Sequence, residues 1–80
     1  MRLDKFLKVS RLIKRRTIAN DACDAGKIVI NGTPAKASYN VKPGDIIEIN
    51  MGARTLKVKI TNIDEHANKE TASECYTIVE

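Results

Sequence analysis

Apolar residues in the first part of the chain recur at intervals of three, four and one, the spacing of one helix face. They predict a helix over residues 3–13, in which Ser10 is a candidate break. A second helix is predicted to begin at Thr17, a good N-cap residue, and to end at Gly26, a good C′ residue. Its apolar face is made of small residues, so we expect close packing against the first helix. The apolar positions are Leu3, Phe6, Leu7, Leu12, Ile13, Ala19, Ala22 and Cys23, with Ile18 as a further candidate contact.

From residue 28 onward the pattern changes to short apolar runs, which are typical of strands. Residues 28–30 lead into Asn31-Gly32, a strong type I′ hairpin signal. Residues 33–37 are expected to return as an edge strand because they contain Pro34. The sequence Lys-Pro-Gly-Asp at residues 42–45 predicts a type II turn. Further strands are expected over residues 46–49, 56–61 and 76–79, with a turn at 51–53 and a mobile polar loop over 64–74.

This order of elements predicts an α+β fold, with two N-terminal helices packed on a small, mostly antiparallel β-sheet. The chain has 80 residues, 42% of them apolar, which is enough for one small globular domain. We therefore expect a single domain over residues 1–80, with a core motif over 1–50 and C-terminal strands over 51–80. This length argues against an enzyme with separate cofactor and substrate domains.

The two cysteines are too few and too far apart for a disulfide framework, so we expect reduced thiols. Cys23 is expected in the core and Cys75 half-buried near the last strand. No apolar run approaches the roughly 18 residues of a membrane span. Charges interrupt the N-terminus every two or three residues, unlike the core of a signal peptide. These features predict a soluble, cytoplasmic protein.

Positive charge is concentrated at the N-terminus. The net charge is +4, but residues 1–16 carry seven basic residues against Asp4 alone, and residues 61–80 carry Lys69 against five acidic residues. This asymmetry favours a polyanionic partner, nucleic acid before membrane. Arginine suits phosphate because its planar group donates two parallel hydrogen bonds, and free N–H groups at a helix start add to the attraction. The alternative is a solvated helix face without a ligand.

Asp4 has two interpretations from its spacing. It could be structural, by orienting Lys8 one turn later or by stabilising the start of the first helix. It could instead accept a hydrogen bond from a base edge or a ribose hydroxyl. Spacing alone favours the structural role.

Catalysis finds little support in the sequence. His66 is the only histidine and stands in the acidic loop without an obvious partner. One histidine and two distant cysteines do not supply the three or four ligands of a metal site, and no glycine-rich phosphate motif is present. The scarce aromatics (Phe6, Tyr39 and Tyr76) disfavour a reader that stacks successive bases. We therefore expect no enzymatic activity, no cofactor and no metal, and recognition of folded RNA through its backbone and shape.

Three segments together resemble the RNA-binding domain named after ribosomal protein S4. They are Arg2-Leu3-Asp4-Lys5, then Arg16-Thr17-x-Ala19, then residues 26–32, Gly-Lys-Ile-Val-Ile-Asn-Gly. The match covers about residues 1–50, and the combined pattern is specific. One departure is Arg15, which stands where the family usually has a serine; it puts a charge in place of a hydroxyl and should not harm phosphate binding. The resemblance implies the alpha-L RNA-binding fold.

Among stand-alone members, the chain resembles the ribosome-associated heat-shock protein fifteen family, especially its short form, RqcP. The likeness extends to Tyr76-Thr77-Ile78 near the end. The longer form has a basic C-terminal extension, whereas the last 20 residues of this chain are mostly acidic in their charged positions. The resemblance implies a non-enzymatic, monomeric factor of bacterial ribosome-associated quality control. Such a factor binds rRNA and tRNA on the free large ribosomal subunit, and holds P-site peptidyl-tRNA while its partner RqcH adds alanines to the stalled chain.

A general rRNA chaperone or large-subunit assembly factor remains the alternative function. By position match, the resemblance implies RNA contacts at Arg2, Asp4, Lys5, Arg11, Lys14, Arg15, Arg16 and Lys36. For Asp4, the resemblance favours a functional role more than spacing alone does.

Overall fold

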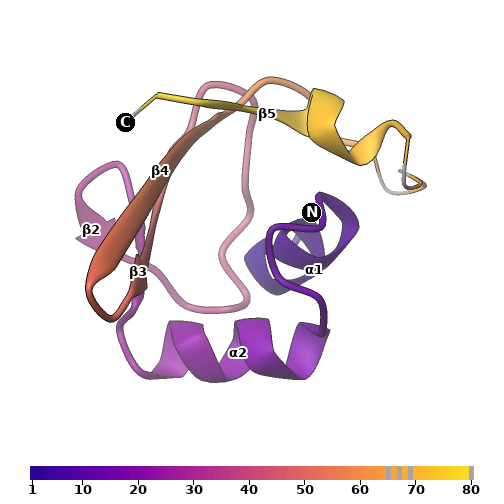
Figure 1. Cartoon of the computed structure of the whole chain (residues 1–80). Coiled ribbons are helices and arrows are strands. Elements are labelled where there is room, and N and C mark those ends of the chain that lie inside the picture. The colour runs from indigo at the N-terminus through magenta and orange to yellow at the C-terminus, as the bar shows by residue number, and fades with distance from the viewer. Residues whose placement is uncertain (65, 67, 69, 80) are drawn as a thin grey trace.

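The computed structural model describes residues 1–64, 66, 68 and 70–79 and confirms the α+β fold (Figure 1). Two short helices precede a five-stranded sheet of order β2-β1-β3-β4-β5, in which all neighbouring strands are antiparallel. The elements are α1 (Leu3–Val9), α2 (Arg16–Asp24), β1 (Ile28–Ile30), β2 (Thr33–Pro34), β3 (Ile46–Met51), β4 (Arg54–Ile60), the 3₁₀ helix η1 (Ala72–Cys75) and β5 (Tyr76–Ile78). Among the described residues, no helix is long and apolar enough to cross a bilayer.

The first helix ends earlier than its apolar spacing predicts. α1 stops at Val9, Ser10 caps it, and Arg11 adopts the left-handed conformation with φ +62°. The Ile13 amide donates to the Leu7 carbonyl at 3.0 Å, which closes the helix end. The candidate break at Ser10 is therefore confirmed, and the extension to residue 13 is wrong. Leu12 and Ile13 still pack against the core, which explains why their spacing imitates a longer helix.

The second helix begins at Arg16, one residue before the predicted N-cap Thr17. Arg15 is the N-cap, and its side chain makes no capping hydrogen bond. Gly26 terminates the segment with φ +73°, as predicted. Ala19 and Cys23 are buried, whereas Ile18 is 52% exposed. Ile18 is therefore wrong as a packing contact, because it lies about 100° around the helix from Ala19.

The β1–β2 hairpin turns at Asn31 and Gly32, which both have positive φ, as a type I′ turn requires. Its return strand is confirmed at the edge of the sheet but stops at Pro34 instead of residue 37. Beyond it the chain leaves the sheet and reaches α1, where the Asp4 amide donates to Ala37 O and the Leu3 amide to Tyr39 O. The loop after β2 therefore fixes the position of the N-terminus.

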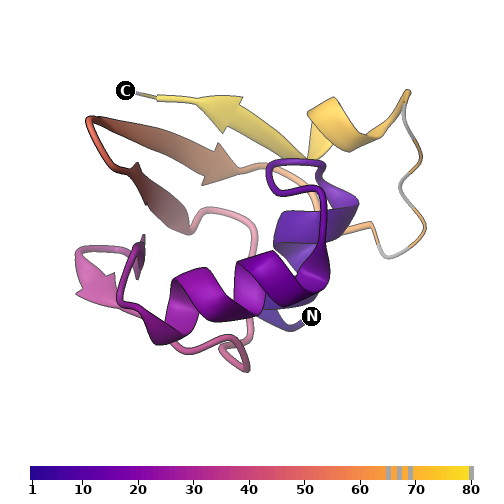
Figure 2. The same ribbon diagram turned by 60° about the horizontal axis from the view of Figure 1, so that its bottom comes forward.

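The core lies between α1 and the sheet. Leu3, Phe6 and Leu7 are fully buried against the inward positions of the strands. Those positions are Ile28, Ile30, Ile47, Ile49, Val58 and Ile60. α2 covers one side of the molecule and β5 lies on the opposite side (Figure 2).

The last part of the predicted polar loop over residues 64–74 is more ordered than its composition predicts. Residues 72–75 form η1, with Ala72 and Cys75 buried, so the expected loop over 64–74 is wrong in its last part. Cys75 is also buried instead of half-buried, because the Thr61 amide binds the Cys75 carbonyl and holds η1 on β4. Residues 65, 67 and 69 of the predicted loop lie outside the described residues.

Candidate nucleic-acid interface

A network of polar contacts surrounds Asp4, which is only 2% exposed in the first turn of α1. Arg2 donates from Nε to Oδ1 at 3.2 Å, and Arg16 Nε lies 3.2 Å from Oδ2. Asn20 donates from Nδ2 to Oδ2 at 3.3 Å, and the Lys5 amide donates to Oδ1 at 2.8 Å. We call Arg2, Asp4, Arg16 and Asn20 the Asp4 cluster. It joins the chain before α1 to the first turns of α2.

Asp4 remains a carboxylate in this cluster. Burial raises its pKa, but the hydrogen bonds from Arg16 and Arg2 and the Arg16 charge outweigh burial, so the pKa is below its usual value of 3.8. The partners are Arg2 and Arg16 and not Lys8, which the spacing had suggested. The side chains of the two arginines remain 50% and 46% exposed. Asp4 therefore fixes two guanidinium groups whose remaining N–H groups can face a ligand.

Lys36 is brought next to this cluster by the loop after β2. The Val41 amide donates to Met1 O at 2.9 Å, and Arg2 forms an isolated antiparallel bridge with Asn40. As a result, Arg2 and Lys36 line one surface hollow, which Ser38 also borders. The structure therefore places together two candidate residues that are 34 positions apart in the chain.

A second basic group lies at the end of α1 and in the loop that follows. Lys8, Arg11 and Lys14 are exposed and line a shared hollow with Val9. Arg15 is exposed at the start of α2. Lys5 is half-buried, unlike the other basic candidates.

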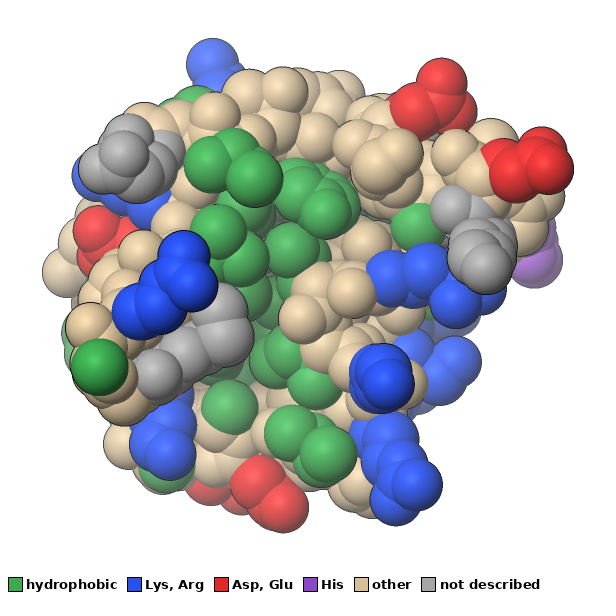
Figure 3. Space-filling view, in the orientation of Figure 1, with side chains coloured by type: hydrophobic (Ala, Val, Ile, Leu, Met, Phe, Trp, Pro, Cys, Tyr) green, Lys and Arg blue, Asp and Glu red, His purple; other side chains and the backbone are tan. Residues whose placement is uncertain are grey.

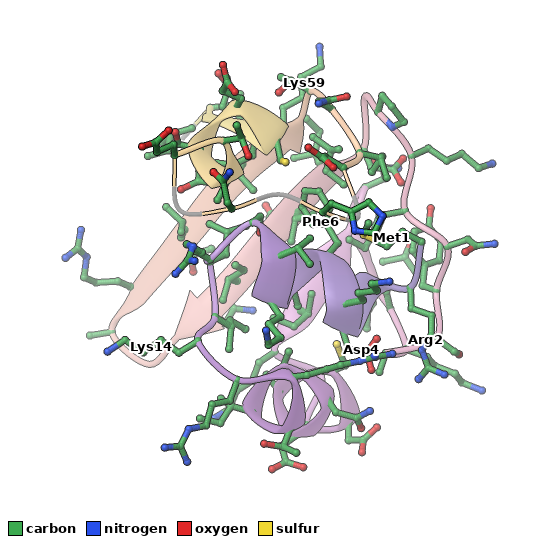
Figure 4. The ribbon with its side chains drawn as sticks, turned by 90° about the vertical axis from the view of Figure 1, so that its right-hand side faces the viewer. Met1, Arg2, Asp4, Phe6, Lys14 and Lys59 are labelled. Carbon is green, nitrogen blue, oxygen red and sulfur yellow. The ribbon has the colours of Figure 1, made fainter. Side chains whose placement is uncertain are left out.

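Both groups lie on the side of the molecule drawn in Figure 4, where Arg2 and Lys14 stand at opposite edges and the start of α2 is seen end-on between them. Lys59 on β4 lies at the far end of the same view. We call the exposed basic residues of these two groups the basic face. They are Arg2, Lys8, Arg11, Lys14, Arg15, Arg16 and Lys36.

Acidic side chains border the basic face without covering the part that is visible. In Figure 3 one group of Lys and Arg side chains lies at the right and lower right, others lie at the left and top, and acidic side chains lie at the upper right, at the left and at the bottom. Asp21 lines a hollow with Asp4 and Arg16, and Asp24 lines the hollow of Arg2 and Lys36. The positive surface is thus limited along α2.

Sequence reasoning missed Asn20, although a signal for it exists. Asn20 stands four residues after Arg16 on α2, so helical spacing puts both on the same face toward Asp4. Lys8 was counted in the N-terminal charge but not among the candidate contacts, and it shares a hollow with Arg11 and Lys14. Among the described residues, no group of three or more His, Cys, Asp or Glu could hold a metal ion.

Known proteins are similar to this chain in sequence and in structure. The model of the S4 domain family matches residues 1–47. RQC P-site tRNA stabilizing factors from Listeria monocytogenes and Bacillus subtilis are both 52% identical over 79 residues, which covers 99% of this chain and 86% and 92% of theirs.

Two solved structures share the fold. The trimeric structure of Vibrio cholerae Heat Shock Protein 15 has a TM-score of 0.91 and 30% identity, covering 99% of this chain and 81% of that chain. The solution structure of the hypothetical protein HP1423 has a TM-score of 0.84 and 34% identity, covering 100% and 98%. The two helices with their Asp4 cluster fall within the matched residues 1–47, and the chain belongs to the S4 domain family of RNA-binding domains, together with the RQC P-site tRNA stabilizing factors.

Proposed function

We propose that this chain is a non-enzymatic RNA-binding factor of bacterial ribosome-associated quality control. It binds rRNA and tRNA on the free large ribosomal subunit, and it holds peptidyl-tRNA in the P site while RqcH extends the stalled chain with alanines. The proposal is carried by the 52% identity, over 99% of the chain, to two factors named for stabilising P-site tRNA. The proposed role is carried out in the cytoplasm, by a monomer.

The Asp4 cluster supports RNA binding through a physical argument. Each guanidinium has five N–H donors, and Asp4 engages only some of those of Arg2 and Arg16. The remaining donors are held in place before a ligand arrives, so less side-chain freedom is lost when phosphates bind. Two fixed arginines with Lys36 nearby suit the phosphates of a folded RNA, whose shape is read largely through its backbone.

The proposal is tested by the co-sedimentation of purified protein with large subunits that carry peptidyl-tRNA. Replacing Arg16 by Ala should weaken binding by about 1–3 kcal/mol, because a charge-assisted contact is lost. Lys59→Ala is the matched control. It also removes one positive charge from an exposed side chain, but at the far end of the molecule. Equal effects of the two substitutions would contradict the assignment of the basic face to RNA.

Density-gradient sedimentation of ribosomal particles distinguishes the proposed function from the alternative function. A quality-control factor follows large subunits that carry peptidyl-tRNA, whereas an rRNA chaperone or assembly factor follows immature subunit precursors. The oligomeric state is measured on the same sample, because the structure of the related Heat Shock Protein 15 is described as trimeric. A monomer mass in solution is the expected result.

A further inference from the structure

Beside the basic face is a hollow of about 290 Å³ that shares Lys36, but neither Arg2 nor Arg16, with the proposed phosphate contacts. It lies between β2 and the loop that follows. This volume is close to the lower end of the roughly 300–1,000 Å³ of ligand pockets, so it suits a small group. Its walls are mostly apolar, with polar groups at a few positions: Ile30, Pro34, Ala35 and Tyr39, with Thr33, Lys36 and Ser38. We call it the Tyr39 hollow.

The aromatic wall of this hollow is held rigidly. The Tyr39 hydroxyl donates to Asp45 Oδ2 at 3.3 Å, and the Tyr39 amide donates to Lys36 O at 3.0 Å. Asp45 is itself fixed, because the Lys42 amide and the Asn31 side chain donate to its two oxygens at 3.0 and 3.1 Å. The ring is therefore positioned before any ligand binds, which lowers the ordering cost of stacking on it.

The Tyr39 hollow is continuous with the basic face. Lys36 and Ser38 border it on one side and border the hollow of Arg2 on the other. Lys36 and Ser38 thus separate the candidate phosphate position beside Arg2 from the hollow that Tyr39 lines. Unpaired bases are recognised by this combination of an aromatic face with hydrogen-bonding groups at the edges.

Resting on the proposed function, we infer that the Tyr39 hollow receives one unpaired nucleobase of the bound RNA. The apolar walls contact the faces of the base, and the hydroxyls of Thr33 and Ser38 meet its polar edge. Of the residues that line the hollow, Tyr39 alone is aromatic, so the hollow offers one stacking surface and takes one base. The chain therefore reads RNA mainly by backbone and shape, with a single base contact added.

A photochemical experiment identifies the occupant. Thr33, exposed at the rim of the hollow, is replaced by the photoreactive amino acid p-benzoylphenylalanine in the full chain, and the protein is irradiated on large subunits that carry peptidyl-tRNA. The expected product joins the protein to one unpaired nucleotide of rRNA or tRNA. The same photoreactive group at Ala53, in the turn between β3 and β4, should give no crosslink to that nucleotide.

A filling variant measures what the base contributes. Ala35→Leu occupies the hollow and should weaken subunit binding by at least about fivefold, the lower bound for one stacked base. Ala53→Leu adds the same bulk at an exposed site outside the hollow and should bind like the parent chain. Circular dichroism and thermal melting confirm that Ala35→Leu is folded; if it is not, the crosslink decides alone.

Two results would overturn the inference while leaving the proposed function intact. One is a crosslink from residue 33 to a ribosomal protein or to nothing, on subunits that the protein does bind. The other is a folded Ala35→Leu variant with unchanged affinity. Failure of the unmodified chain to bind the subunits at all would instead reject the proposed function, and the base contact with it.

Discussion

At the scale of single residues, Asp4 stands out because its charged side chain is only 2% exposed. A buried carboxylate is costly unless hydrogen bonds and opposite charges compensate for lost water. Asp4 receives hydrogen bonds from two side chains and one amide and pairs with two arginines, and no buried side-chain N or O atom is unsatisfied in the part of the chain that the structure describes. The structural interpretation is supported, with Arg2 and Arg16 as partners in place of Lys8, whereas direct RNA contact by Asp4 stays a prediction.

Replacing Asp4 by Asn should lower the free energy of unfolding by about 1–3 kcal/mol near pH 7, because both arginines lose their counter-charge. Since the pKa of Asp4 is lowered in the folded state, its contribution is present above the usual value of 3.8 and is lost as pH falls below it. Urea titrations should therefore show the difference from the parent chain shrinking below about pH 4.

Asp21→Asn is the matched control for that measurement, because Asp21 is an exposed acid on α2. It should change the unfolding free energy by no more than about 0.5 kcal/mol. A constant deficit for Asp4→Asn from neutral to strongly acidic pH would show that shape, and not charge, makes Asp4 necessary.

At the scale of elements, the sequence predicts those whose signal is local. The hairpin at Asn31-Gly32, the turn with Gly44 at φ +97° and the alternation over β4 each depend on a few adjacent residues, and each is present. The end of α1 was missed, because Leu12 and Ile13 face the core from a loop and so preserve helical spacing. η1 was missed because its burial depends on β4, which is distant in the chain and invisible to periodicity.

For the candidate site, too, the sequence predicts the local features and not the contacts between distant segments. Charge counting and the family resemblance indicate which arginines and lysines matter. They do not show that Asp4 is shared between Arg2 and Arg16, since that contact requires the two helices to pack. Nor do they show that Lys36 joins Arg2, which depends on the loop after β2 leaving the sheet at Pro34.

The hairpin gives a prediction at this scale. Gly32 has φ +85°, and a Cβ there would meet no atom within 4 Å, so the cost of a side chain is conformational and not steric crowding by neighbours. Gly32→Ala should lower the unfolding free energy by about 1–2 kcal/mol. Gly32→Asn should cost less, because asparagine tolerates this conformation better. Equal melting temperatures of the two variants would contradict the assigned turn.

At the scale of the whole molecule, the two cysteines report global unfolding. Both are buried. Burial, together with the charges of Asp4 and Asp24, raises the pKa of Cys23 to about 11. Burial also raises the pKa of Cys75. Neither should react with Ellman's reagent at pH 8 until denaturant unfolds the chain, because the thiols are largely protonated and the reagent cannot reach the buried sulfur atoms. Ser73→Cys, at an exposed position of η1, supplies a reactive control. Labelling of the native thiols at the control's rate in folded protein would contradict the buried core.

The extent of the RNA contact is also a property of the whole molecule, and salt can measure it. Each phosphate neutralised by a basic residue releases counterions, so the logarithm of the binding constant falls linearly with the logarithm of salt concentration. Arg2→Ala and Lys14→Ala should each reduce the magnitude of that slope by about one for the large-subunit complex, whereas Lys59→Ala should leave it unchanged. Arg2 and Lys14 stand at opposite edges of the basic face, so a reduced slope for both requires RNA to cover the whole of it. A reduced slope for Arg2→Ala alone would confine the contact to the Asp4 cluster and leave the loop after α1 in solvent.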